Sequence, residues 1–291
     1  MFDGFQAFDV DCAGIAIHGV CGGSGPPLLL LHGYPQTHAM WHKLAPLLEP
    51  HFTVIAADLR GYGRSGKPDA VPDHASYSKR AMAADMVQLM AHLGHERFAI
   101  CGHDRGGRVA HRLAMDWPDR VSRMALLDIA PTREMYANAN DVFARAYWWW
   151  FYLIQKAPLP ESMIGGDPEA YWKMKCGAGT AGLAPFSDEA LADYLECFNN
   201  PATIHATCED YRAAASIDIM HDDADGERKI ECPLLVIWGK YGVIETCFDA
   251  LALWRQRASN VSGFALPAGH YLAEEIPDQL YPCLQQFFDE V

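Results

Sequence analysis

The feature that most constrains the fold of this chain is a series of short apolar runs, each followed by a turn rich in glycine or aspartate. Such runs are typical of strands buried on both faces of a parallel sheet. They occupy residues 27–31, 53–57, 98–101, 124–127 and 234–238. Helical patterns at 81–93 and 105–116 lie between them. Strands alternating with helices predict an α/β fold with a mostly parallel sheet flanked by helices, where ligands bind beyond the carboxyl ends of the strands.

The middle of the chain lacks this pattern. Between residues 132 and 225, helical stretches and aromatic runs replace the strand-like runs, and the α/β pattern then resumes until a final amphipathic helix near residues 277–288. We therefore expect an α/β core of residues 1–131 and 226–291. Residues 132–225 are expected to form a helical cap inserted over the active site.

Composition excludes several classes of protein. The chain has 23 lysines and arginines against 37 acidic residues, a formal net charge of −14, which is unfavourable for binding nucleic acid. Its longest strongly apolar stretch, 146–154, is far shorter than the roughly 20 residues that span a bilayer, and no cationic leader opens the sequence. Nine cysteines without a C-x-x-C pair indicate reduced thiols. We expect a soluble cytoplasmic protein that binds neither membrane, nucleic acid nor metal.

The most informative segment is Gly102-His103-Asp104-Arg105-Gly106, which follows a strand-like run and opens a helix. It has the form of the G-x-S-x-G nucleophile elbow, with aspartate in place of serine. Small residues flank the turn because little room is left there, and the helix N-terminus favours an ionised Asp104. An ionised carboxylate can attack a saturated carbon that carries a leaving group and form an ester. The alternative is an aspartate that merely caps the helix.

Two further residues fit the same site. His270 follows the strand-like run 261–266 and could act as a general base at the same sheet edge. Asp128, at the end of the run 124–127, could orient that imidazole and balance its charge. The loop after residue 238 offers Glu245 and no aspartate, which makes Asp128 the preferred acid.

The order Asp104, Asp128, His270, together with the loop His32-Gly33-Tyr34-Pro35-Gln36, resembles the α/β-hydrolase superfamily. The resemblance implies an oxyanion hole made by the backbone N–H groups of Tyr34 and Arg105. The segment 61–66 also matches G-x-G-x-x-G, but a proline at position 68 replaces the helix that a dinucleotide site needs. No cofactor is expected.

Within that superfamily, residues 103–108 look like those of the fluoroacetate (haloacetate) dehalogenases. Arg105 and Arg108 are three residues apart on one helical face, so the two guanidinium groups could clamp a substrate carboxylate. The resemblance implies a halide site at Trp149, Trp150 and Tyr211. The family has histidine where this chain has Trp149. Because fluoride needs several donors as its charge develops, we expect chloro- or bromoacetate to be favoured over fluoroacetate.

The sequence thus predicts hydrolysis of short 2-haloacids to 2-hydroxyacids, haloacetate giving glycolate plus halide, through an aspartyl ester. An epoxide hydrolase with the same three residues is the alternative, with Tyr147, Tyr152 and Tyr211 available to protonate the epoxide oxygen. A ligand-binding module without catalysis is a third reading, since fold does not fix function. The partner is a small haloacid, and the exposed helices leave room for a homodimer.

Overall fold

The computed structural model describes residues 1–289 and is built on one eight-stranded sheet in the order β1-β2-β4-β3-β5-β6-β7-β8. Strands β3 to β8 pair in parallel, whereas β2 pairs antiparallel with both β1 and β4. The expected α/β class with a mostly parallel sheet is confirmed. The strands are β1 Gln6–Cys12, β2 Ile15–Gly22, β3 Pro27–Leu31, β4 Thr53–Ala57, β5 Phe98–His103, β6 Val121–Leu127, β7 Leu234–Gly239 and β8 Val261–Leu266.

The strands β3, β4 and β5 are the expected apolar runs, and nearly all of their side chains are buried. The hairpin β1–β2 at the sheet edge was not anticipated. In β1, exposed positions are interspersed with the buried ones, so this strand contains no continuous apolar run. Ala13 and Gly14 turn the chain there with positive φ angles.

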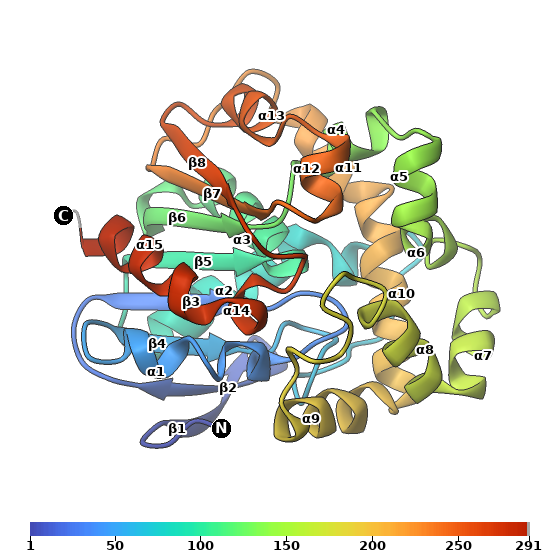
Figure 1. The fold of residues 1–291 in the computed structure, drawn as a ribbon, viewed down its shortest axis with the longest axis horizontal. Helices are drawn as coiled ribbons and strands as arrows, with labels where there is room; N and C mark the ends of the chain where they lie inside the picture. Colours follow the sequence, from blue (N-terminus) through green and yellow to red (C-terminus); the bar gives the residue numbers. More distant parts are fainter. Residues whose placement is uncertain (290–291) are drawn as a thin grey trace.

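Helices cover both faces of the sheet. On one face α2 and α3 pack against each other, and on the other α1 contacts α15 (Figure 1). Helix α13 packs beside β8. These helices of the expected core are α1 Ala45–Leu48, α2 Lys79–His92, α3 Arg105–Asp116, α12 Val243–Cys247, α13 Ala250–Arg257, α14 Leu272–Glu275 and α15 Pro277–Asp289.

Every regular element between β6 and β7 is a helix. Figure 1 shows most of these inserted helices gathered on one side of the molecule, beyond the arrowheads of the parallel strands. They are α4 Thr132–Ala137, α5 Asp141–Ala146, α6 Trp148–Tyr152, α7 Leu159–Gly166, α8 Pro168–Cys176, α9 Asp188–Phe198, α10 Pro201–Ala214 and α11 Ile217–Ala224. They therefore stand next to the sheet edge at which the expected site residues lie.

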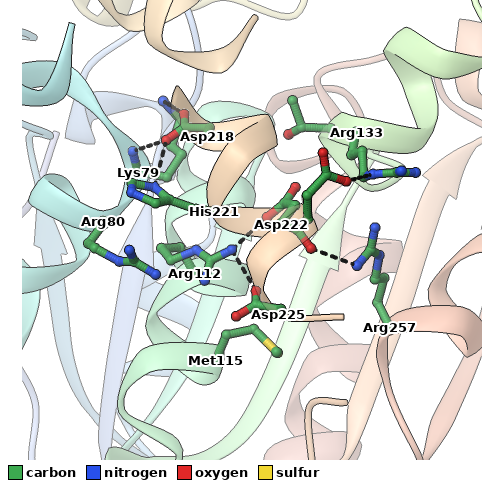
Figure 2. A network of polar contacts seen from close by, with 12 residues as sticks. Lys79, Arg80, Arg112, Met115, Arg133, Asp218, His221, Asp222, Asp225 and Arg257 are labelled. Atoms are coloured by element: carbon green, nitrogen blue, oxygen red, sulfur yellow. Dashed lines mark hydrogen bonds and ion pairs between the residues drawn. The ribbon is translucent and has the colours of Figure 1, made fainter. Parts of the chain in front are cut away.

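Ion pairs join α11 to the core (Figure 2). Arg112 of α3 is almost fully buried, and its Nη2 lies 2.6 Å from Asp222 Oδ1 and 2.8 Å from Asp225 Oδ2. In α2, which packs against α3, Lys79 Nζ lies 3.6 Å from Asp218 Oδ2. From the other side, Arg257 donates to the carbonyl of Asp222. The last inserted helix is thus held by residues of α2, α3 and α13.

Within residues 1–289, no helix has the length and apolar character needed to cross a bilayer. All nine cysteines are free thiols, as their spacing indicated.

Candidate active site

The bend between β5 and α3 places Asp104 at the carboxyl edge of the sheet. Its φ of 43° and ψ of −111° are unusual for a residue other than glycine. A Cβ at Gly102 would lie 2.6 Å from the Gly106 carbonyl oxygen, and one at Gly106 would lie 2.4 Å from the Leu31 carbonyl oxygen. Such distances are not tolerated, so the bend needs glycine on both sides. This is the geometry expected of a nucleophile elbow.

The two oxygens of the Asp104 carboxylate have different surroundings. Oδ2 accepts a hydrogen bond from the backbone N–H of Tyr34 at 3.1 Å, whereas Oδ1 lies 3.9 Å from Arg108 Nε. Burial raises the pKa of Asp104, but the nearby charges of His270, Arg108 and Arg105 outweigh burial and lower it to about 2. The group is therefore an ionised carboxylate at neutral pH, with Oδ2 held by Tyr34 and Oδ1 close to Arg108.

The histidine and the acid expected beside it are in contact. His270 Nδ1 lies 2.6 Å from Asp128 Oδ2, and Asp128 Oδ1 accepts the backbone N–H of Gly239 at 2.9 Å. Because Nδ1 is engaged, Nε2 is the nitrogen left to accept a proton. Glu245, the weaker candidate, accepts instead from the indole N–H of Trp238.

The loop that carries His270 is held by a residue that sequence analysis did not single out. The two carboxylate oxygens of Glu275 accept the backbone N–H groups of Gly269 and Tyr271, at 2.7 and 2.9 Å. His103 Nε2 lies 2.8 Å from the carbonyl oxygen of His270. The backbone on both sides of the histidine is therefore fixed. The close spacing of Glu275 to His270 was visible in the sequence, but its role was not.

Arg105 is fully buried and most of its donors are engaged by the inserted helices. Its Nε and Nη2 lie 2.9 and 2.7 Å from the two carboxylate oxygens of Asp210 in α10, while Nη1 has no hydrogen-bond partner. The Arg105 Cζ atom lies 4.2 Å from the centre of the Tyr211 ring. The backbone N–H of Arg105 stands at the first position of α3, where no acceptor exists within the helix. Asp210 therefore determines that Nη1 is the side-chain nitrogen of Arg105 left without a partner.

Arg108 is arranged in a similar way. Its Nη1 donates to the carbonyl of Ala130 and to Thr132 Oγ1, whereas Nε has no hydrogen-bond partner among residues 1–289. Its Cζ lies 4.7 Å from the centre of the Trp150 ring. Each arginine thus keeps one buried side-chain nitrogen without a hydrogen-bond partner, Nη1 of Arg105 and Nε of Arg108.

Two hydroxyl groups add to these unused donors. The Oη atoms of Tyr136 and Tyr211 are buried and have no hydrogen-bond partner within the described residues. The centre of the Trp150 ring lies 5.0 Å from the centre of the Tyr136 ring and 6.2 Å from that of the Tyr211 ring. A buried polar group without a partner costs about 1–3 kcal/mol, so such a cluster suits a ligand that accepts hydrogen bonds. Tyr136 lies in α4, and nothing in the sequence pointed to it.

These features agree with the comparisons to known proteins. A family model described as the α/β-hydrolase fold matches residues 26–275. The chain belongs to this family. It is 46% identical to a fluoroacetate dehalogenase of Burkholderia sp. over 100% of this chain and 96% of the relative. The expected resemblance and the assignment as a hydrolase are confirmed.

Other relatives of this α/β hydrolase carry different names. A soluble epoxide hydrolase of Corynebacterium sp. strain C12 is 33% identical over 94% of each chain. The crystal structure of an α/β hydrolase from Nostoc sp. PCC 7120 matches with a TM-score of 0.97 and 54% identity over 100% of both chains. The family alone therefore leaves both the dehalogenase and the epoxide hydrolase readings open.

The residues expected at the halide site lie on α6 and α10 of this hydrolase. Trp150 and Tyr211 are buried beside the arginines, as described above. Trp149 is 8% exposed, and its ring lies 4.7 Å from the Tyr147 ring and 4.7 Å from Lys175 Nζ. It lines a cavity of about 450 Å³ that His270 also lines. Trp149 thus faces the approach to His270, and Trp150 and Tyr211 face the arginines.

One group of potential metal ligands occurs among residues 1–289, made of His18, His38 and Asp58. Asp58 Oδ1 is hydrogen-bonded to His38 Nδ1 at 2.9 Å, and its Oδ2 accepts the backbone N–H of Arg64. His18 Nδ1 is bound to Asp9 at 3.0 Å. The group is already occupied by contacts within the protein and lies outside the site around Asp104.

Proposed function

We propose that this hydrolase cleaves the carbon–halogen bond of short 2-haloacids, converting haloacetate into glycolate and halide. The observation that carries the proposal is the ionised Asp104 beside two buried arginines, Arg105 and Arg108, each with one side-chain nitrogen that has no hydrogen-bond partner. A carboxylate nucleophile suits attack on a saturated carbon, and two guanidinium groups suit a substrate that carries a carboxylate.

In the first step, the arginines hold the substrate carboxylate and place its α-carbon near Asp104 Oδ1. A bond forms between Oδ1 and that carbon while the carbon–halogen bond breaks, and the electron pair leaves with the halide. Trp150 and Tyr211 receive the halide, with Trp149 at its outer side. The product of this step is an ester of Asp104.

In the second step, His270 Nε2 takes a proton from water, and the hydroxide attacks Cγ of Asp104. Negative charge develops on Oδ2, the oxygen that already accepts the backbone N–H of Tyr34 at 3.1 Å. The backbone N–H of Arg105 is the second donor. The bond between Cγ and Oδ1 then breaks. Glycolate leaves with Oδ1 and takes the proton from His270, while Asp128 stabilises the imidazolium in the meantime.

The same proposal includes the division of the chain into a core of residues 1–131 and 226–291 and a cap of residues 132–225. Trp150, Asp210 and Tyr211 come from the inserted helices, so the substrate would be enclosed between cap and core. Because Trp149 stands where the resembling family has histidine, and its ring faces Lys175, chloro- and bromoacetate would react faster than fluoroacetate.

The test is a single turnover of His270→Ala with chloroacetate, followed by mass analysis of the intact protein and of the peptide containing Asp104. We expect an adduct with the mass of the glycolyl ester to accumulate on Asp104, because no base activates water. His51→Ala, at an exposed histidine outside the site, is the matched control and should show no adduct. Wild-type turnover by His270→Ala would refute the assignment.

An epoxide hydrolase is the second candidate, favoured by the unpartnered hydroxyl groups of Tyr136 and Tyr211, which could donate to an epoxide oxygen. The unused N–H groups of Arg105 and Arg108 have no counterpart in a neutral epoxide. Comparing halide release from haloacetates with the hydrolysis of styrene oxide decides between the two, because the preferred substrate class should exceed the other in kcat/KM by orders of magnitude.

A further inference from the structure

Lys175, near the end of α8, is a buried ammonium group that has no carboxylate partner in the described part of the chain. It is 4% exposed, and its Nζ donates to the carbonyl oxygen of Tyr34 at 3.0 Å and to Tyr271 Oη at 3.1 Å. None of the ion pairs found in residues 1–289 includes it. An ammonium group has three N–H donors, so one remains after these two hydrogen bonds. A buried charge with so little compensation lowers the stability of the folded protein, so stability by itself does not explain its presence.

Aromatic rings surround this ammonium group. Nζ lies 4.7 Å from the centre of the Trp149 ring, 5.2 Å from that of Tyr34 and 5.5 Å from that of Tyr271. Ring faces attract cations electrostatically without neutralising them. Burial lowers the pKa of Lys175, whereas Cys176 and Asp104 act to raise it. The surroundings therefore hold the ammonium group in place but leave its charge available to an anionic ligand.

The position of Lys175 connects it to the catalytic groups. The backbone N–H of Tyr34 contacts Asp104, and Tyr271 directly follows His270. Lys175 and His270 line the same cavity of about 450 Å³, whose lining also includes the exposed residue Tyr241. A molecule that enters by this cavity therefore meets the ammonium group beside the catalytic histidine.

We propose that Lys175 is a specificity residue that selects substrates bearing a carboxylate as they enter the active site. The proposal rests on the proposed function, because it assumes that the cavity leads the substrate to Asp104. The chain carries a formal charge of −14, so its average field repels anions. A local cation in a low-dielectric cleft can reverse this repulsion and raise the association rate of an anion by about 10- to 1000-fold. A neutral epoxide would gain nothing from it.

A purely structural role makes a different prediction. If Lys175 only tied α8 to the loops of Tyr34 and Tyr271, its loss would lower stability and kcat, whatever the charge of the ligand. A role in selecting anions changes KM and anion binding and leaves the rate of the chemical step near its original value.

The experiment uses the full chain with Lys175→Met, which removes the charge and keeps most of the side-chain length, and Lys175→Arg, which keeps the charge. Lys173→Met is the matched control, because Lys173 lies on the same helix but is paired with Glu169 at the surface. We measure kcat and KM for chloroacetate, and the Kd for acetate by tryptophan fluorescence. For Lys175→Met we expect KM and Kd to rise about tenfold with kcat within twofold. Lys175→Arg and Lys173→Met should stay within threefold of wild type.

Unchanged KM and acetate Kd in Lys175→Met would overturn the proposal. So would an equal loss of kcat in Lys175→Met and Lys175→Arg, because that pattern indicates a structural role. Failure of the proposed function has a separate signature: wild-type protein would release no halide from any haloacetate. The acetate measurement would then still report whether Lys175 selects anions.

Discussion

Neutralising Asp210 tests the reasoning about the buried arginine most directly. Asp210 and Arg105 are both fully buried, and two hydrogen bonds of 2.9 and 2.7 Å join their side chains. Lys79 Nζ also contacts the Asp210 carboxylate. In Asp210→Asn these two cations lose their shared anion, and Asp218, 3.6 Å from Lys79, is the carboxylate left nearby. Breaking a buried ion pair from one side costs about 3–5 kcal/mol.

The pH dependence gives the prediction a second, independent feature. Burial raises the pKa of Asp210, but Arg105 and Lys79 outweigh burial and hold it well below its usual range. The stabilisation is therefore complete above about pH 4, the ordinary pKa of an aspartate, and is lost as pH falls towards the lower pKa of the folded state. Urea unfolding at pH 7 should show wild type more stable than Asp210→Asn by about 3–5 kcal/mol. The difference should shrink below pH 4.

The same variant has a functional consequence, because Arg105 would lose the contact that keeps Nη1 free for the substrate. We expect KM for chloroacetate to rise at least tenfold, which corresponds to about one hydrogen bond to a charged group. Asp223→Asn is the control: Asp223 pairs with Arg133 at the surface, where such pairs contribute less than about 1 kcal/mol. A loss below 1 kcal/mol in Asp210→Asn, or a loss independent of pH, would refute the reasoning.

Three further outcomes follow from single side chains. Trp149→His should speed fluoride release from fluoroacetate by roughly a hundredfold relative to chloride release, the worth of one added donor of about 3 kcal/mol; equal gains for both halides would contradict this. Tyr136→Phe should raise KM for chloroacetate without lowering the unfolding free energy, because the hydroxyl has no partner within the protein; a stability loss above 1 kcal/mol would count against it. Burial raises the pKa of Glu274 to about 8 despite its hydrogen bonds to Tyr194 and Gln36, so wild type should lose stability relative to Glu274→Gln by up to about 1.4 kcal/mol per pH unit between pH 4.5 and 8. Parallel unfolding curves across that range would contradict the last expectation.

Sequence reasoning reached Asp104, Asp128 and His270 because each follows a strand-like run. The strands before Asp104 and Asp128 are mostly buried, whereas β8, before His270, is half-exposed. Apolar runs identify such strands locally, and the carboxyl ends of parallel strands meet at one edge of the sheet. The contact between Asp128 and His270, 142 residues apart in the chain, could be expected on this ground alone. The elbow was equally readable, since its glycines are required by atoms a few residues away or on the adjacent strand.

The inserted helices were predicted as helical, but their contacts with the core were not. The tie between Asp210 and Arg105, the free hydroxyl of Tyr136 and the ammonium of Lys175 all depend on how α4, α8 and α10 lie against the sheet. Helical periodicity identifies an apolar face but not the partner that covers it, since many dockings bury similar area. The edge hairpin β1–β2 escaped notice for a related reason: its half-exposed strands carry no continuous apolar run.

The sequence by itself therefore determined the α/β sheet, the bend that presents Asp104 and the order of the residues around it, because short-range sterics and strand burial leave few alternatives. Tertiary structure alone decided which N–H groups of Arg105 and Arg108 stay unused and which cation stands beside His270. Those features arise where side chains from distant segments compete for the same partners, and only their packing together settles which atoms are satisfied.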